Sequence, residues 1–235
     1  MGFSSEWDKC YQAKSQLSVW PWSDIVSLVN RYCKNLIAKG GGRVHEFGCG
    51  AGANIPFFLA LGMDYSAVEG SPTIVRQLHE RYPDLADKIR IGDFTRNPQF
   101  PCNYDIVIDR AALTHNTTKA IRCALQIAFD SLKPGGVFIG TDWFSKNHTD
   151  FNGGEQSEDE FTRNNHIKGQ FIGVGNVHFS DEPHLRDLFS KYEIIFMEEK
   201  IFKRYEPKDN HQFASWNIVA RKSSFKNTVT TSKRY

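Results

Sequence analysis

The stretch Glu46-Phe47-Gly48-Cys49-Gly50-Ala51-Gly52 decides the fold, because it places an acid and three glycines where a buried strand passes into a helix. Residues 43–47 predict the strand and residues 55–61 the helix, with Asn54 as its N-cap and Gly62 as its C-terminal stop. Glycines in such a turn let the backbone approach a ligand, because a Cβ would clash and would disfavour a positive φ. The stretch therefore predicts a turn that binds a nucleotide-like ligand.

Two ligand classes use a turn of this kind, and the glycine spacing alone fits both. Gly48, Gly50 and Ala53 satisfy the spacing of dinucleotide binders, in which a pyrophosphate lies at the helix N-terminus. Gly48, Gly50 and Gly52 also give a tighter G-x-G-x-G spacing, which Glu46 precedes. A carboxylate here would repel a pyrophosphate but would attract a ligand that carries an ammonium and a sulfonium group. The acid-x-Gly-x-Gly pattern resembles motif I of the class I S-adenosylmethionine (SAM) dependent methyltransferases.

Acids that follow the next strands fit a nucleoside ligand. The run 64–68 ends at Glu69, where SAM-binding and dinucleotide-binding folds both place an acid on the ribose hydroxyls. Residues 89–91 lead to Asp93 and Phe94, and the resemblance implies that this acid and ring frame the adenine. The resemblance implies SAM as the cofactor, S-adenosylhomocysteine as the product, and the following cofactor-binding residues: Glu46, Gly48, Cys49, Gly50, Asn54, Glu69, Gly70, Asp93, Phe94, Asp109 and Trp20.

The middle of the chain continues the alternation of strands and helices. Residues 104–109 predict a buried strand that ends in Asp109, and residues 117–132 predict an amphipathic helix. Lys133-Pro134-Gly135-Gly136 ends that helix and turns the chain into a buried strand at residues 137–143. A Leu-Lys-Pro-Gly-Gly run before a strand is frequent in the class I family.

The last part of the chain predicts a helix and a pair of strands. Ser180 or Asp181 can cap a helix that has Pro183 in its first turn, and residues 193–201 and 213–221 then predict two strands joined by a polar loop. The family resemblance, over residues 43–221, implies an α/β fold: a Rossmann-like, seven-stranded, mostly parallel sheet with helices on both faces. An antiparallel C-terminal hairpin, an N-terminal helical cap and an insertion after strand five complete the expected fold.

Composition indicates one domain, since 235 residues that are 40% hydrophobic and 24% charged can bury a large core without disulfides. We expect a single domain over residues 1–222, with an N-terminal cap segment at 1–40 and a lid insertion at 145–180, and a disordered basic tail at 223–235.

The five cysteines are odd in number and lack C-x-x-C spacing, so they predict free thiols in the cytoplasm. Neither a signal peptide nor a membrane span is expected, and the net charge of +2 gives no footprint for nucleic acid. The sequence carries no expectation about the oligomeric state.

Methyl transfer requires little beyond near-attack geometry and, for a hydroxyl or ammonium acceptor, a base. The resemblance places the acceptor at the carboxyl ends of strands four and five, which makes Asp142 and His115 candidate catalytic residues. A packed, hydrogen-bonded loop histidine is the alternative for His115. His178, in the insertion, is a third candidate, and a histidine packed in the core is its alternative. Asp109 and Asp142 together resemble the carboxylates of metal-assisted catechol-type O-methyltransferases. A third oxygen ligand is missing because Trp143 follows, so no metal is expected.

The segment before the first strand adds aromatic residues. Four aromatic residues lie close together in this segment: Trp7, Tyr11, Trp20 and Trp22. Ser23 is expected as the N-cap of a helix over residues 24–36. The face of a tryptophan ring, here assigned to Trp20, can stabilise a sulfonium by cation–π attraction. Terminal anchoring of the segment to the sheet is the alternative.

The expected function is SAM-dependent methylation of a small molecule, with O-methylation favoured over N-methylation. Residues 109–115 lack the Asn/Asp-Pro-Pro-aromatic run of base-amino methyltransferases, which argues against a nucleic-acid substrate. A nicotinamide or flavin oxidoreductase and a non-catalytic SAM-binding protein are the alternatives.

Overall fold

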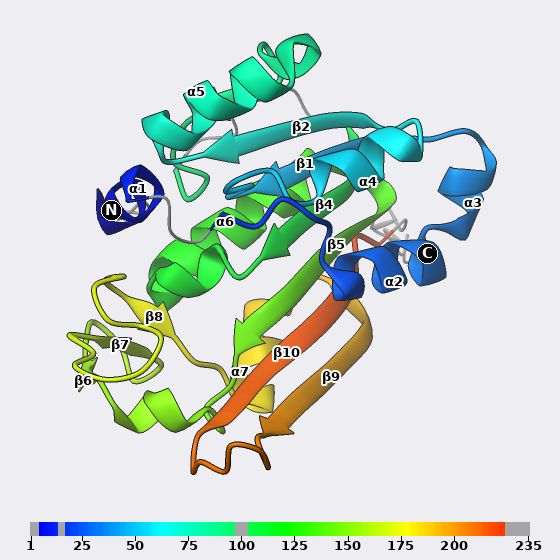
Figure 1. Cartoon of the computed structure of the whole chain (residues 1–235). Coiled ribbons are helices and arrows are strands. Elements are labelled where there is room, and N and C mark those ends of the chain that lie inside the picture. The colour runs from blue at the N-terminus through cyan, green and yellow to red at the C-terminus, as the bar shows by residue number, and fades with distance from the viewer. Residues whose placement is uncertain (1–4, 14–16, 97–102, 224–235) are drawn as a thin grey trace, which may run out of the picture.

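The computed structural model describes residues 5–13, 17–96 and 103–223, and its centre is a seven-stranded sheet of order β3-β2-β1-β4-β5-β10-β9. The strands β1 to β5 run parallel, while β10 pairs antiparallel with both β5 and β9 (Figure 1). The strands of this sheet are β1 (Arg43–Phe47), β2 (Asp64–Glu69), β3 (Ile89–Ile91), β4 (Tyr104–Arg110), β5 (Leu132–Phe144), β9 (Glu193–Lys203) and β10 (Gln212–Arg221). This order confirms the Rossmann-like sheet and its antiparallel C-terminal hairpin.

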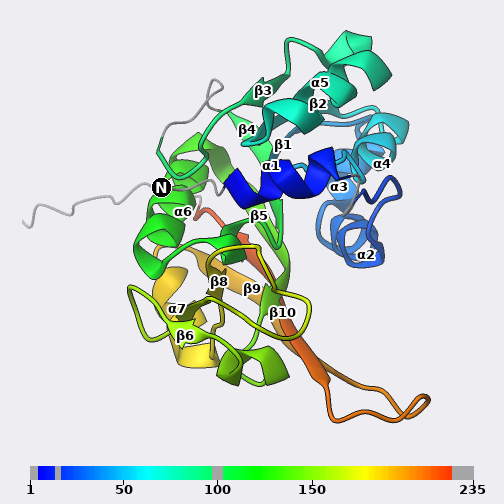
Figure 2. The same ribbon diagram turned by 60° about the vertical axis from the view of Figure 1, so that its left-hand side comes forward.

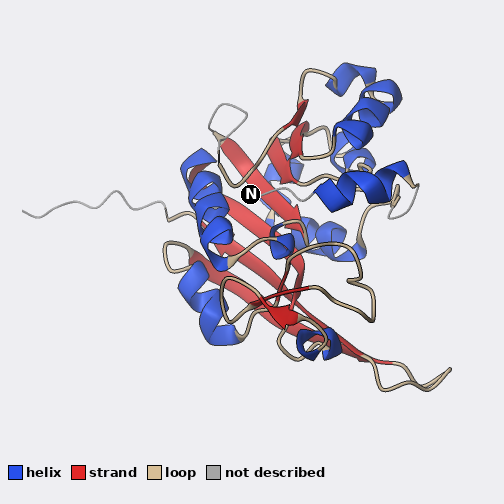
Figure 3. Ribbon diagram, turned by 90° about the vertical axis from the view of Figure 1, so that its left-hand side faces the viewer, coloured by secondary structure: helices blue, strands red, loops and turns tan. Residues whose placement is uncertain are grey.

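Helices cover both faces of the sheet, as expected from the alternating sequence pattern (Figure 3). The helices α2, α4 and α5 bury one apolar side against one face, and α6 and α7 bury theirs against the other. The helices are α1 (Ser5–Gln12), α2 (Ser23–Tyr32), α3 (Lys34–Ala38), α4 (Ile55–Ala60), α5 (Pro72–Arg81), α6 (Thr118–Ser131) and α7 (Glu182–Leu188). Short 3-10 turns lie at η1 (Pro83–Leu85), η2 (Leu113–His115) and η3 (Thr149–Asn152).

The insertion after β5 forms its own small antiparallel sheet of order β6-β7-β8. Its strands are β6 (Glu155–Gln156), β7 (Thr162–Asn164) and β8 (Val177–His178). Figures 1 and 2 show this insertion and α1 at the edge of the sheet where β1 and β2 end. Because β1 and β4 are neighbours and the chain leaves them in opposite directions, this edge is where an open α/β sheet has its crevice.

Helix boundaries differ from the sequence prediction at the N-terminal end. The helix expected over residues 24–36 is two helices, α2 and α3, because Cys33 leaves the helical conformation at φ −116° and ψ 21°. Ser23 is the first residue of α2 rather than its cap, and Trp22 takes the cap position without a side-chain hydrogen bond. The interruption turns the chain toward β1.

Two of the other predicted helix ends, the start of α7 and the end of α4, are confirmed. Asp181 caps α7 by accepting a hydrogen bond from the His184 amide, and Pro183 lies in the first turn. Thr117 caps α6 in the same way, and Gly62 follows α4 with φ +66°. Among the described residues, no helix is both long and apolar enough to cross a lipid bilayer.

Five histidines with lowered pKa values make the stability of this fold sensitive to acid. Burial lowers the pKa of His45 and His178 to about 3 and that of His115, His148 and His184 to about 4, against an ordinary value of 6.5. The unfolded chain therefore binds five protons from about pH 6.5 downward, while the folded chain binds them only near pH 4 and below.

Three buried acids act in the opposite direction. Burial raises the pKa of Glu46 and Asp109 to about 7 and also raises that of Glu69, so the folded chain binds protons at these acids that the unfolded chain takes up only below about pH 4.5. Between these limits the histidines outnumber the acids, and the unfolded chain binds more protons than the folded one.

We therefore expect the free energy of unfolding to fall as the pH is lowered from about 6.5 to about 4. Each net proton contributes about 1.4 kcal/mol per pH unit, so the expected slope is on the order of 2 kcal/mol per pH unit. Urea unfolding at a series of pH values between 7 and 5 measures it. A stability that is constant or increases over this range would contradict the buried, neutral state of these histidines.

Candidate functional site

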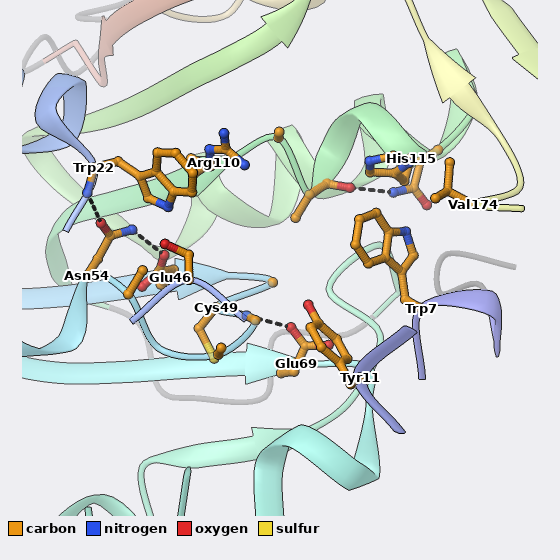
Figure 4. Close-up of a pocket in the computed structure, with 18 of the residues that line it drawn as sticks. Trp7, Tyr11, Trp22, Glu46, Cys49, Asn54, Glu69, Arg110, His115 and Val174 are labelled. Atoms are coloured by element: carbon orange, nitrogen blue, oxygen red, sulfur yellow. Dashed lines mark hydrogen bonds between the residues drawn. The ribbon is translucent and has the colours of Figure 1, made fainter. Parts of the chain in front are cut away.

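A cavity of about 290 Å³ lies at the crevice edge of the sheet (Figure 4). Its walls come from the glycine turn after β1, the ends of β2 and β4, the helix α1, and the insertion. Glu46, Asn54, Trp22 and Arg110 lie at one end, and Trp7, His115 and Val174 lie at the other (Figure 4).

The glycine turn borders the cavity with its backbone. Gly48 has φ +62°, and a Cβ there would overlap the Cβ of Ala112 in the loop after β4. Gly50 has φ +50°, and a Cβ there would lie 3.0 Å from the Tyr11 hydroxyl. Both positions therefore require glycine, since an L side chain would be strained and would fill the space between the turn and its covering residues.

Glu46 lines the cavity, but both of its carboxylate oxygens are already hydrogen-bonded. Oε1 accepts from Asn54 Nδ2 at 2.8 Å and Oε2 accepts from the Tyr65 hydroxyl at 2.5 Å. Burial raises the pKa of Glu46 to about 7. The group therefore carries a partial charge near neutral pH, and a cationic ligand beside it would favour the ionised form. Asn54, expected as a helix cap, makes no capping bond and instead positions this acid.

Glu69 connects the end of β2 to the glycine turn. Its Oε2 accepts from the Gly50 amide at 2.9 Å, and its Oε1 accepts from the Ser71 amide at 2.9 Å. Burial raises the pKa of this carboxyl. Gly70, the next residue, lies outside the cavity wall. The acid is thus held at the place where the sequence predicts a ribose contact.

The acid and ring after β3 separate in the structure. Phe94 lines the cavity and stacks on Phe47, with ring centroids 5.5 Å apart and planes inclined by 11°. Asp93 lies outside the cavity wall, where its Oδ1 accepts from the Thr95 amide at 2.9 Å and its Oδ2 pairs with Arg96 at 3.2 Å. Phe94 therefore borders the cavity and Asp93 does not, and the adenine contacts of both residues stay predictions.

Neither Asp109 nor Asp142 borders the cavity, which differs from the expectation for both. Asp109 is fully buried, where it accepts from the Leu113 amide at 3.0 Å and from Trp143 Nε1 at 2.7 Å, and burial raises its pKa to about 7. Asp142, at φ +55°, accepts from Arg110 Nε at 3.0 Å. It also pairs with Lys200 at 3.3 Å. Asp142 therefore reaches the cavity only through Arg110, which lines it.

The two candidate histidines lie in different places. His115 lines the cavity, and its Nδ1 is 3.1 Å from the Asn176 carbonyl, so Nδ1 is the donor and Nε2 the acceptor. Burial lowers its pKa to about 4, which keeps the ring neutral at physiological pH. His178 is buried away from the cavity wall, between Thr162 Oγ1 at 3.1 Å and His184 Nε2 at 3.1 Å. His178 therefore fits the alternative of a histidine packed in the core. His115 is the candidate base that borders the cavity.

The N-terminal aromatics cover the cavity, but with a different tryptophan from the one assigned. The Trp20 side chain is 77% exposed and lies outside the wall, while Trp22 lines it with the Arg110 guanidinium 3.6 Å above its ring. Trp7 and Tyr11 reach the wall from α1. The difference arises because Pro21 separates the two tryptophans and only Trp22, whose amide donates to Asn54 Oδ1 at 3.3 Å, is held against the turn.

Two further wall residues carry polar groups that sequence reasoning missed. Arg110 comes directly after the residue at which the sequence predicted the strand to end. The positive charge that its guanidinium presents to the cavity depends on its ion pair with Asp142. Asn116 is 2% exposed, and its Nδ2 donates to the Ala112 carbonyl at 3.2 Å. Its Oδ1 is buried and has no partner among the described residues. A ligand donor would satisfy this oxygen, which the sequence does not reveal because Asn116 belongs to no motif.

The insertion supplies an aromatic wall opposite the glycine turn. Phe171 and Val174 line the cavity together with Phe144 at the end of β5 and Phe213 on β10. The Phe144 and Phe171 rings meet edge-on, with centroids 4.7 Å apart. This end of the cavity is therefore apolar, apart from His115 and the amides of Asn116 and Gln170.

A sheet of this strand order, with a glycine turn after β1 and an acid at the end of β2, defines the architecture of the class I methyltransferases. Residues 44–136 match the family model of the methyltransferase domain, and they run from β1 into β5. This match covers part of the chain; together with the shared fold of solved SAM-dependent methyltransferases, it bears out the class, the enzyme activity and the cofactor predicted from the sequence. Comparison with curated proteins finds no match.

Solved structures share the fold at low sequence identity. A SAM-dependent methyltransferase from Methanosarcina mazei is 16% identical with a TM-score of 0.63, over 83% of this chain and 97% of that one. The structure of a protein that converts a disulfide bond into a thioacetal group in echinomycin biosynthesis is 18% identical with a TM-score of 0.65, over 97% and 96%. The 1,6-didemethyltoxoflavin N1-methyltransferase of Burkholderia thailandensis, with its substrate and S-adenosylhomocysteine bound, is 16% identical with a TM-score of 0.58, over 93% and 84%.

Proposed function

We propose that this chain transfers the methyl group of SAM to a neutral small molecule that carries a hydroxyl group, so that O-methylation is favoured over N-methylation. The observation that carries the proposal is the composition of the apolar end of the cavity. Its described wall has the neutral ring of His115 and the aromatic rings of Trp7, Phe144 and Phe171. The acids in the described wall, Glu46 and Glu69, belong to the glycine turn and the end of β2. An ammonium acceptor would lack a carboxylate partner at this end, whereas a planar hydroxylated molecule would pack on the rings.

The residues at the other end of the cavity fit the cofactor. We assign the ribose to Glu69 and the adenine to the neighbourhood of Phe94, and the backbone of Gly48, Cys49 and Gly50 to the methionine part. Arg110 offers a positive charge for the methionine carboxylate, and Glu46 offers a negative one for its ammonium group. The unpartnered Asn116 Oδ1 supports a polar ligand in this crevice.

Methyl transfer needs little activation by protein side chains. SAM supplies a methyl group on a sulfonium, whose leaving group is a neutral thioether. The aromatic wall orients the acceptor and excludes water, and His115 Nε2 takes the proton of the acceptor hydroxyl as the new bond forms. The Asn176 carbonyl fixes the tautomer that leaves Nε2 free to accept.

Other proteins of this fold act on small molecules, which agrees with the size of the cavity. The Burkholderia thailandensis relative N-methylates 1,6-didemethyltoxoflavin, so the fold by itself is compatible with nitrogen acceptors. The preference for oxygen therefore depends on the wall residues of this chain. A cytoplasmic location is likewise a proposal, supported by Cys33, Cys49 and Cys123, which form no disulfide among the described residues. Cys102 and residues 224–235 of the tail expected at 223–235 lie outside the described residues.

Titration calorimetry tests the ligand class, and S-adenosylhomocysteine release tests the chemistry. We expect SAM and S-adenosylhomocysteine to bind with one site per chain, NAD and FAD to give no signal, and hydroxylated aromatic compounds to be turned over in preference to amines. Tight dinucleotide binding without a SAM signal would instead identify an oxidoreductase, and SAM binding with no turnover across acceptor classes would identify a SAM-binding protein without catalysis.

The Glu69→Ala variant is expected to weaken SAM binding by about 1 to 3 kcal/mol, because it removes the buried carboxylate assigned to the ribose and leaves the Gly50 amide without its acceptor. Calorimetry on the purified variant measures the loss. Asp84→Ala, an exposed acid in η1, removes the same charge away from the crevice and is expected to bind SAM like the parent chain. Equal affinities for the parent chain and the Glu69→Ala variant would remove Glu69 from the cofactor site.

A further inference from the structure

Three side chains with metal-binding atoms meet outside the cavity. His148 and Asp150 belong to the insertion after β5, and His211 immediately precedes β10. One ligand atom from each lies within 4.8 Å of the others. The two segments are also joined by hydrogen bonds, since Gln212 donates from its amide to Thr149 Oγ1 at 2.7 Å and from its side chain to the Asn147 carbonyl at 2.7 Å.

The carboxylate in this cluster is buried and incompletely satisfied. Asp150 is 7% exposed, and its Oδ1 is 3.5 Å from His211 Nε2. Its Oδ2 is buried without a partner among the described residues, and so is Nδ1 of His166, whose Nε2 contacts the Asp150 carbonyl at 3.1 Å. Gly169, at φ +81°, packs so tightly on Asp150 Oδ2 that a Cβ would come within 2.5 Å. A buried carboxylate oxygen without a partner is costly, and a cation would remove that cost.

We propose that His148, Asp150 and His211 bind a divalent transition-metal ion, with Zn²⁺ as the representative ion. Two imidazole nitrogens and one carboxylate oxygen are ligands that zinc and its neighbours in the first transition series accept, whereas Mg²⁺ and Ca²⁺ prefer oxygen alone. Three protein ligands leave a further coordination position for water.

Ion binding requires a local adjustment of the side chains. The ligand atoms have to close in by on the order of 1 Å to reach the usual metal distances of about 2.0 to 2.2 Å. His148 also gives up one of its two present contacts, with the Asp150 amide at 3.0 Å or with the Gln170 side chain at 3.0 Å. His211 is the half-exposed member of the three, so it can move without disturbing the core.

The ion would act as a positioning element for the cavity wall. The His148 ring lies 5.4 Å from the Phe171 ring and 5.1 Å from the Phe213 ring, and both phenylalanines line the cavity. A metal would therefore fasten the insertion to the β9–β10 hairpin one layer of side chains behind the apolar wall. This inference does not depend on the proposed acceptor.

A zinc competition titration against a chromogenic chelator tests the site in the full-length chain. We expect one Zn²⁺ per chain, an affinity at least tenfold lower in both His211→Gln and Asp150→Asn, and an unchanged affinity in His79→Gln, whose histidine lies on α5. Zn²⁺ should raise the melting temperature of the parent chain but not that of the two site variants, and melting in EDTA verifies that each variant is folded. The proposal is overturned if the parent chain binds no stoichiometric Zn²⁺, or if folded His211→Gln or Asp150→Asn binds it as tightly as the parent chain.

Discussion

Replacing His115 by asparagine is expected to lower kcat by about 10²- to 10⁴-fold and to leave the affinity for SAM nearly unchanged. Asparagine keeps a donor where His115 Nδ1 contacts the Asn176 carbonyl, but it has no equivalent of Nε2. The substitution therefore removes the proton acceptor while the loop keeps its hydrogen bond. Single-turnover kinetics with an acceptor found by the release assay, together with SAM calorimetry, separates the two quantities.

The pH profile and a second histidine variant make this test specific. Because burial lowers the pKa of His115 to about 4, His115 should add no ionisation to kcat between pH 5 and 8, and activity should fall only where the ring or the fold becomes protonated. His178→Asn is the matched control, since His178 is buried in β8 and hydrogen-bonded to Thr162 and His184. It should lower stability and leave kcat of the folded fraction intact. A fully active His115→Asn variant would exclude His115 as the base.

The second large effect is expected at the glycine turn. Gly48→Ala should lower the free energy of unfolding by about 2 to 5 kcal/mol, because it combines a positive φ in an L residue with an overlap against the Cβ of Ala112. Relief of the overlap would displace the turn from the cavity, so SAM affinity should fall by at least about tenfold. Urea unfolding and calorimetry measure the two effects.

A double variant separates the overlap from the backbone strain at Gly48. Gly48→Ala combined with Ala112→Gly removes the overlapping atom, so it should recover part of the stability and SAM affinity, while about 1 to 2 kcal/mol of strain persists. Gly62→Ala is the control, because Gly62 has a similar φ of +66° but lies after α4, away from the cavity wall. It should cost stability without changing SAM affinity. If the double variant is no better than Gly48→Ala, the close approach of the two loops is not what requires glycine.

Much of the fold was predictable because its signals are local. The strand at residues 43–47 was predicted with its observed bounds, and the helix at 117–132 and the strand at 193–201 differ from α6 and β9 only at their ends. Hydrophobic periodicity, capping residues and turn residues lie within a few positions of the element that they define. The helix expected over residues 24–36 was wrong, since nothing in its apolar pattern marks the break at Cys33.

The candidate site was also predictable from the sequence in part. Residues at the carboxyl end of a parallel strand, such as Glu46 and Glu69, line the cavity because the carboxyl ends of parallel strands meet at one edge of the sheet. Asp109 and Asp142 also lie near the carboxyl ends of strands, yet their carboxylates accept hydrogen bonds from Trp143 and Arg110 and do not border the cavity. A strand end determines the edge at which a residue lies, but not the direction of its side chain or the partners that it finds.

The sequence by itself determined the order of the elements, the glycine turn and hence the class of ligand, because each depends on neighbours along the chain. Only the tertiary structure decided that Trp22 rather than Trp20 borders the cavity, and that His115 borders it whereas His178 does not. It alone brought His211 to His148 and Asp150. These are contacts between segments that are distant along the chain. The exposure, the pKa values and the ligand geometry of these residues follow from packing, and the spacing of residue types along the chain does not specify packing.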